Sequence, residues 1–193
     1  MNESLARRSS WVSGSSSISA FPGALSNGSR RTSNSPITTA HRGMIGRLPV
    51  RVLLYYIGKP RNSQANDMAE EYIKRSVRYA KCEMREVRLD KNGPDRFDPF
   101  VKHPDATKIL LDPAGKAIDT PGFIALVKKA EEDARDLVFV IGGSEGLPSE
   151  WKPRANGLLA LSPLTMPHEL ARVVLAEQIY RAFTWLRGHP YPR

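Results

Sequence analysis

Three short runs of apolar residues constrain the fold of this chain more than any other feature. They cover residues 50–57 (VRVLLYYI), 108–112 (KILLD) and 137–141 (LVFVI), and each leads directly into a glycine or a proline. Such runs are typical of strands that are buried on both faces, as in a parallel sheet covered by helices. None approaches the roughly 20 apolar residues of a membrane-spanning helix, so no membrane association is expected.

Segments with helical periodicity alternate with these runs. One helix is expected from Asn62 or Ser63, with an apolar face formed by Ala65, Met68, Ala69, Tyr72, Ile73 and Val77. A second is expected from Thr120 as cap to about residue 134, and a long third helix from about 167 to 187. Alternation of strands and helices predicts an α/β fold with a mostly parallel sheet flanked by helices.

The remaining segments are assigned by composition and alternation. Residues 83–89 and 158–162 are expected to be strands, residues 149–154 a short helix, and residues 113–115 a turn. Residues 90–106 are rich in Asp, Pro, Asn and Gly, which predicts a loop.

Residues 1–43 differ from the rest, with twelve serines, five arginines and one acid. This composition predicts a disordered leader, either an organelle transit peptide or the product of an upstream, mis-assigned start before Met44. We therefore expect a folded domain over residues 44–193, in the cytoplasm or, if the leader is a transit peptide, in an organelle.

Charge and cysteine content limit the partners. The net charge is +9, of which the leader contributes five arginines minus one acid, or +4, so +5 remains on residues 44–193. A basic excess favours a polyanionic partner such as nucleic acid. Cys82 is the one cysteine, which excludes an internal disulfide and a cysteine metal cluster, and no metal site is expected.

Three segments follow predicted strands and are expected at the carboxyl edge of the sheet, where α/β proteins bind ligands. They are residues 111–115, the glycine-rich residues 141–146 (IGGSEG), and residues 161–167 (LSPLTMP). Glycines allow a ligand close to the backbone, and two prolines keep residues 164–166 out of regular structure. Apolar side chains beside free backbone groups suit an adenine ring. A tight turn and a structural connector are the alternatives.

The long helix and the tail contain the candidate catalytic and RNA-binding residues. His168, in the first helical turn, is the leading candidate for a proton acceptor, with a structural role as the alternative. Arg172 is a candidate for orienting substrate or pairing with Glu169, and Arg181 for phosphate binding. His189 and Tyr191 lie in an aromatic, basic tail that is suited to stacking on a base.

The segments IGGSEGL and LSPLTMPHELARVVLAEQIYRAFTWLRGHPY, with VLLYYIGKPR and LLDPAGK before them, closely resemble the ribosomal large-subunit pseudouridine methyltransferase family of the SPOUT class. The resemblance covers residues from about 50 to the end. It implies a SPOUT α/β fold with a C-terminal trefoil knot and a homodimer with the cofactor pocket at the subunit interface. It also implies S-adenosyl-L-methionine as cofactor and N3 of a pseudouridine in large-subunit ribosomal RNA, in the assembled ribosome, as substrate.

By matching positions, the resemblance assigns the cofactor contacts to Leu111, Gly142, Leu161, Ser162, Pro163, Leu164, Thr165 and Met166. By residue type and position, His168, Arg172 and Tyr191 are the candidate catalytic residues, and Arg172, Arg181, His189 and Tyr191 the candidate RNA-binding residues.

This chain departs from the family at its tail, where Pro192 replaces a histidine. The departure motivates an alternative, a ribosome-binding protein of the same fold with impaired catalysis. A third interpretation is a methyltransferase of this fold that acts on transfer RNA.

Overall fold

The computed structural model describes residues 50–89 and 97–191. Predictions that concern residues 1–49, 90–96 and 192–193 lie outside the described residues. The elements in chain order are β1 (Arg51–Ile57), α1 (Ser63–Ser76), β2 (Lys81–Val87), α2 (Pro99–Lys102), β3 (Thr107–Ala117), α3 (Thr120–Asp133), β4 (Leu137–Ile141), the 3-10 helix η1 (Ser149–Arg154), β5 (Gly157–Ala160) and α4 (His168–Leu186).

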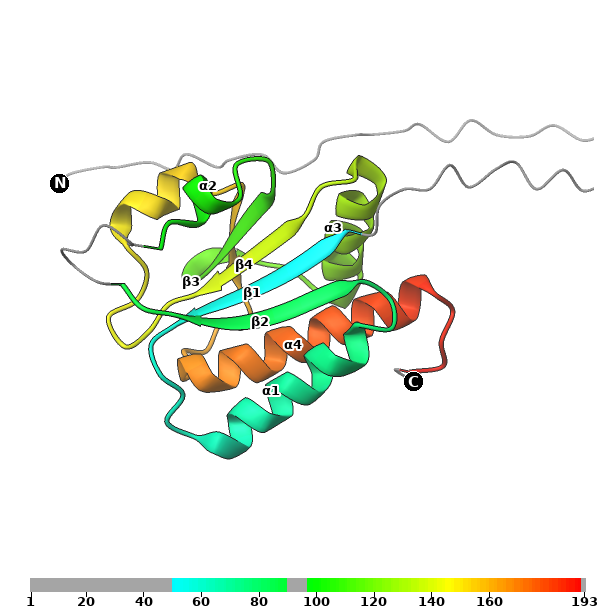
Figure 1. Cartoon of the computed structure of the whole chain (residues 1–193), viewed down its shortest axis with the longest axis horizontal. Helices are drawn as coiled ribbons and strands as arrows, with labels where there is room; N and C mark the ends of the chain where they lie inside the picture. Colours follow the sequence, from blue (N-terminus) through cyan, green and yellow to red (C-terminus); the bar gives the residue numbers. More distant parts are fainter. Residues whose placement is uncertain (1–49, 90–96, 192–193) are drawn as a thin grey trace, which may run out of the picture. The chain divides into compact units, whose positions relative to one another are not determined.

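The five strands form one sheet in the order β2-β1-β4-β3-β5, and every pairing between them is parallel (Figure 1). This confirms the predicted α/β class with a parallel sheet flanked by helices. From β1 the chain passes to β2 at one edge of the sheet. It then crosses to the other side of β1, where β3 and then β4 are added, with β4 next to β1. The direction of winding therefore changes between β1 and β4, which is where ligands bind in open α/β sheets.

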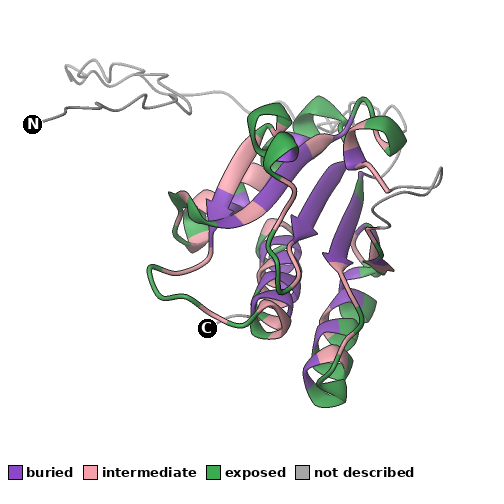
Figure 2. Cartoon of the chain, turned by 90° about the vertical axis from the view of Figure 1, so that its left-hand side faces the viewer, coloured by how far each residue is buried: buried purple, intermediate pink, exposed green. Residues whose placement is uncertain are grey.

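Both faces of the sheet are covered, as the continuously apolar strands predict. On one face Leu54 and Phe139 pack with Leu175 and Phe183 of α4 and with side chains of α1 and α3. On the other face Tyr55 and its neighbours pack around Trp151 of η1. Figure 2 shows the buried strands and the outer, exposed faces of the helices.

Two strands differ from their predicted bounds. β2 begins at Lys81 rather than residue 83, because Lys81–Val87 pairs residue for residue with Arg51–Ile57 of β1. β3 continues through residues 113–115, where a turn was predicted. The pairing of β3 with β5 shifts register between Leu111 and Lys116, and this irregularity accommodates Pro113 inside the strand.

Three other boundaries are also corrected. The predicted loop 90–106 contains α2, which is capped by Asp98 through the Phe100 amide. Asp119, not Thr120, caps α3, and its carboxylate accepts from the Gly122 amide at 2.8 Å. β5 ends at Ala160, so the two residues that follow belong to the segment before α4.

The apolar face predicted for α1 is only partly buried. Ala65, Ala69 and Ile73 are buried, the last two in the core cluster with the sheet and α4, whereas Met68 and Val77 are more than half exposed. Ser76 occupies the fourth buried position instead, where its hydroxyl donates to a backbone carbonyl one turn earlier.

Cys82 lies on β2 and is buried, and burial raises the pKa of its thiol to about 12. A thiol in this state is a packing residue and not a nucleophile. Among the helices of the described part, none has the length and hydropathy to cross a membrane.

Candidate functional site

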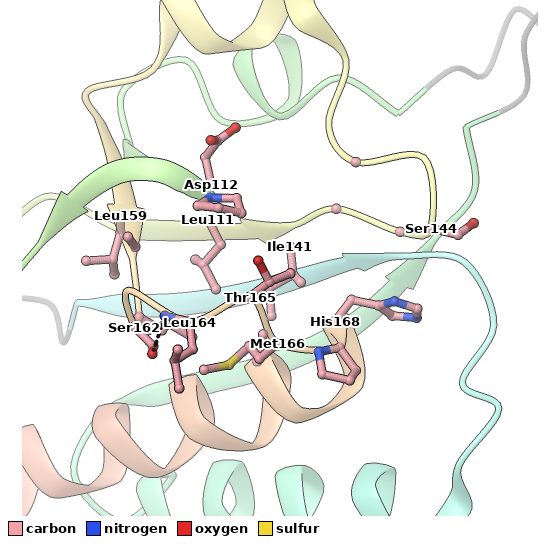
Figure 3. Close-up of a pocket in the computed structure, with 18 residues that line it drawn as sticks. Leu111, Asp112, Ile141, Ser144, Leu159, Ser162, Leu164, Thr165, Met166 and His168 are labelled. Atoms are coloured by element: carbon pink, nitrogen blue, oxygen red, sulfur yellow. Dashed lines mark hydrogen bonds between the residues drawn. The ribbon is translucent and has the colours of Figure 1, made fainter.

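A pocket of about 390 Å³ opens at the carboxyl ends of β3, β4 and β5 (Figure 3). Small-molecule sites typically measure roughly 300–1,000 Å³. Residues 111–113, 141–144, 159–162 and 164–168 contribute most of its wall, and Gly146 and Ala171 complete it. The three segments that follow predicted strands therefore meet at one place.

The predicted cofactor residues are brought together there with one exception. Those that line the pocket are Leu111, Gly142, Leu161, Ser162, Leu164, Thr165 and Met166. Pro163 is exposed and is not among the lining residues. His168, the first residue of α4, also lines the pocket, and Figure 3 shows its ring on the same side as Ser144.

The glycine segment folds back on itself beside the pocket. The Gly146 amide donates to the Gly143 carbonyl at 3.0 Å, and Gly146 has a φ of +78°, which favours glycine. A Cβ at Gly142 would lie 2.7 Å from the backbone carbon of Gly146. The backbone approach at Gly142 thus requires the absence of a side chain.

The proline-flanked segment presents both apolar groups and backbone groups. The Ser162 hydroxyl accepts from the Leu164 amide at 2.9 Å and holds the bend between the two prolines. Leu164 itself is 79% exposed, although it lies at the pocket. A flat apolar ring with polar edges fits a wall of this composition.

Several lining residues were not predicted individually, among them Asp112, Ile141, Leu159 and Ala171. Ile141 and Leu159 belong to buried strands, and the sequence carries no signal that separates them from other core residues. Ala171 follows His168 by about one helical turn, so its position follows once α4 is known to begin at His168.

Asp112 is the buried acid of the pocket. Its carboxylate accepts from the Ala114 amide at 2.8 Å and pairs with Lys152 of η1 at 2.7 Å. The hydrogen bond from Lys152 lowers the pKa of Asp112, the Ala114 amide adds to this effect, and burial opposes it. The ion pair joins η1 to the irregular part of β3 and so supports one side of the pocket.

Arg172 is buried, with 1% of its surface exposed, and does not line the pocket. Its guanidinium lies over the Tyr56 ring at 4.1 Å and is 3.8 Å from the Glu169 carboxylate. Among the described residues, Nε and Nη2 of Arg172 have no hydrogen-bond partner. In a single subunit this side chain does not reach RNA at the surface.

The other predicted RNA-binding residues lie at the far end of α4. Arg181 pairs with Glu177 at 2.6 Å, and the Tyr191 hydroxyl donates to the same carboxylate at 3.0 Å. The Tyr191 ring packs on Tyr180, with centroids 4.8 Å apart, while His189 is exposed. A 19-residue helix spans about 28 Å, so one subunit does not bring its tail to its own pocket.

Within residues 50–89 and 97–191, no group of three or more His, Cys, Asp or Glu side chains is arranged to hold a metal ion.

Comparison with known proteins places these observations in a family. A family model described as "Predicted SPOUT methyltransferase" matches residues 50–192. A protein of Solibacter usitatus named ribosomal RNA large subunit methyltransferase H is 54% identical over 144 residues, which cover 75% of this chain and all of the relative. A protein of the same name from Gemmatimonas aurantiaca is 37% identical, over 74% of this chain and 99% of the relative.

Among solved structures, a probable methyltransferase from Bordetella pertussis has a TM-score of 0.48 at 14% identity, over 69% of this chain and 95% of that chain.

Proposed function

The chain belongs to the SPOUT methyltransferase family and, within it, to the ribosomal RNA large subunit methyltransferases H; from this premise we propose that it methylates N3 of a pseudouridine in large-subunit ribosomal RNA. The observation that supports the proposal most strongly is 54% identity over the entire length of a relative with that name. The predicted cofactor segments also line one pocket.

The cofactor of SPOUT methyltransferases is S-adenosyl-L-methionine, and the pocket fits it. An adenosyl group needs apolar faces and polar partners at its edges, which Leu111, Ile141, residues 161–162 and residues 164–166 provide. The Gly142 backbone leaves room that a Cβ would occupy. We propose these residues, with Pro163 supporting the bend from outside, as the cofactor site.

When bound, S-adenosyl-L-methionine supplies a methyl group that is already activated on sulfur, so the protein has mainly to align the accepting nitrogen. That ring nitrogen loses a proton on methylation, and an imidazole is suited to accept one near neutral pH. His168 borders the pocket and is our proposed proton acceptor.

Arg172 is proposed as a positioning residue rather than as a direct RNA contact. Its guanidinium lies between Tyr56 at the end of β1 and Glu169 in the first turn of α4. Glu169 in turn accepts from the Arg61 and Asn62 amides, at 2.6 and 2.8 Å. This chain of contacts fixes the start of α4, and therefore His168, against the loop after β1.

We further propose that the active form is a homodimer. Leu170, Val174 and Trp185 are exposed and lie on one face along the whole of α4, and exposed Leu164 precedes them. Exposed apolar surface of this extent is typical of an interface. A two-fold pairing that runs the two α4 helices antiparallel brings each tail, with Arg181, His189 and Tyr191, toward the pocket of the partner.

We propose residues 44–193 as the methyltransferase domain and the cytoplasm as its compartment. The family match covers residues 50–192, which lie within this proposed domain.

The proposed substrate is tested by incubating the purified chain and labelled S-adenosyl-L-methionine with ribosomes from a strain that lacks the gene. We expect label in large-subunit RNA and none in free transfer RNA. Label in transfer RNA alone would support the transfer-RNA alternative, and ribosome binding without label would support the catalytically impaired one.

A further inference from the structure

A second pocket lies beside the cofactor pocket and has no role in the proposed function so far. Its volume is about 980 Å³, and it lies between the end of β1 and the loop after β4, where the winding of the sheet changes direction. The two pockets share Gly143, Ser144, Gly146 and His168. A group bound in the second pocket therefore borders the same four residues as a group in the first, among them the proposed proton acceptor.

The charged side chains of the second pocket are segregated. Lys59 and Arg61 come from the loop after β1 and Arg88 follows β2, whereas Glu145 comes from the loop after β4 and Glu150 from η1. Lys59 and Arg61 are exposed, and neither forms an ion pair with an acid of the described part. An anion is thus directed to the wall that Lys59 and Arg61 form.

This basic wall is held in place by backbone contacts. The Gly58 amide donates to the Val87 carbonyl at 3.0 Å, and the Glu169 carboxylate accepts from the Arg61 and Asn62 amides. Glu169 follows His168 directly in α4. The loop that carries the two cations is therefore fixed to the helical turn that borders both pockets.

Resting on the proposed function, we propose that the second pocket binds the accepting nucleotide of the RNA, with its adjoining phosphates on Lys59 and Arg61. Enzymes that modify a base take it out of its stack and hold it in a pocket, while cations bind the backbone on either side. A nucleotide in this position brings its ring to the residues that both pockets share, directly beside the pocket proposed for the methyl donor.

The variant Lys59→Gln/Arg61→Gln tests the proposal in the full chain. Loss of two phosphate contacts should raise KM for ribosomes about tenfold or more. It should also make the plot of log binding constant for RNA against log salt concentration less steep, by about two units of slope. Affinity for S-adenosyl-L-methionine, measured by calorimetry, should stay within about twofold. The conservative exchange Lys59→Arg/Arg61→Lys should keep KM near that of the unchanged chain.

The matched control is Lys128→Gln/Lys129→Gln, which removes the same charge from α3, outside both pockets. It should leave KM and the salt slope unchanged. Equal KM and equal salt slopes for Lys59→Gln/Arg61→Gln and the unchanged chain would overturn the proposal. Fluorescence anisotropy of a labelled large-subunit RNA hairpin measures binding by the same variants and tests the proposal without methylation. A failure of the unchanged chain to methylate ribosomes would contradict the proposed function and not this proposal.

Discussion

Gly142 and Arg172 show how single residues determine what this pocket can bind and how its surroundings are held. Gly142 directly follows the buried strand β4, and its backbone lies so near Gly146 that a Cβ has no room. Arg172 is a buried cation whose free donors are not matched by acceptors in the described part of the chain. The sequence predicts the first of these features from glycine content, but burial of Arg172 depends on the packing of α4 and is not visible in the sequence.

Replacement of Gly142 by alanine should weaken cofactor binding. The added Cβ would lie 2.7 Å from backbone carbon of Gly146, so the turn must shift, at a cost of about 1–3 kcal/mol. We expect a loss of affinity for S-adenosyl-L-methionine of about tenfold in calorimetry of the folded variant. Gly122→Ala, on α3 and outside the pocket, is the control. Unchanged affinity in Gly142→Ala would show that the turn does not border the bound cofactor.

Exchange of Arg172 for methionine should separate stability from activity. Replacement of a buried, incompletely paired charge by an apolar side chain is often neutral or stabilising, so we expect the free energy of unfolding to fall by no more than about 1 kcal/mol. Methyl transfer should fall at least tenfold, because Glu169 and the start of α4 lose a contact. Urea unfolding and steady-state kinetics measure the two effects. A loss of more than about 3 kcal/mol would instead indicate a structural role for the charge.

At the scale of elements, the buried strands were the most predictable part. β4 has the bounds that its apolar run predicts, and α4 begins and ends within one residue of its prediction. The predicted bounds are wrong where contacts outside the apolar periodicity determine how a helix begins or how far a strand extends. Asp119 displaces Thr120 as the cap of α3, and pairing with β5 keeps Pro113 within β3. Local composition does not specify contacts with a strand that comes about 40 residues later.

The first residue of β1, Arg51, and the residue directly before β4, Asp136, form an ion pair that gives stability a pH dependence. Asp136 accepts from the Arg51 amide at 2.9 Å and from its Nε at 2.8 Å. Burial opposes ionisation of Asp136, but these hydrogen bonds and the Arg51 charge outweigh it and lower its pKa. A carboxyl whose pKa is lowered on folding stabilises the protein above its unfolded pKa of about 4, and the effect is lost as pH falls below that value.

We therefore expect Asp136→Asn to lower the free energy of unfolding by about 1 kcal/mol at pH 7, after allowance for partial solvent exposure of the pair. The difference from the unchanged chain should shrink as pH falls from about 4 toward 3. Urea unfolding of both proteins at a series of pH values measures it. A difference that stays constant over this range would show that the charge of Asp136 does not contribute.

At the scale of the whole molecule, the sequence predicted the site better than its assembly. The strand order places the ends of β3, β4 and β5 together, which brings the predicted cofactor segments into one pocket. Arg181, His189 and Tyr191 lie at the opposite end of α4, so residues expected to act together are apart in one subunit. The trefoil knot and the dimer remain predictions from the family resemblance.

The dimer is tested at Trp185, which is 62% exposed on α4. Introduction of a charge by Trp185→Lys should shift sedimentation from dimer to monomer and lower methyl transfer at least tenfold, since each tail is proposed to serve the partner's pocket. Val101→Lys alters a residue that is 75% exposed on α2, away from α4. It should change neither the sedimentation of the dimer nor the rate of methyl transfer. Full activity of a monomeric Trp185→Lys would contradict the shared site.

The central claim is that this pocket serves methylation of a pseudouridine in large-subunit ribosomal RNA. Nucleoside mass spectrometry of that RNA tests it most directly, in cells with the gene, without it, and with the gene carrying Gly142→Leu. The account predicts N3-methylpseudouridine only in cells with the unchanged gene. Equal amounts of this nucleoside in all three would contradict it.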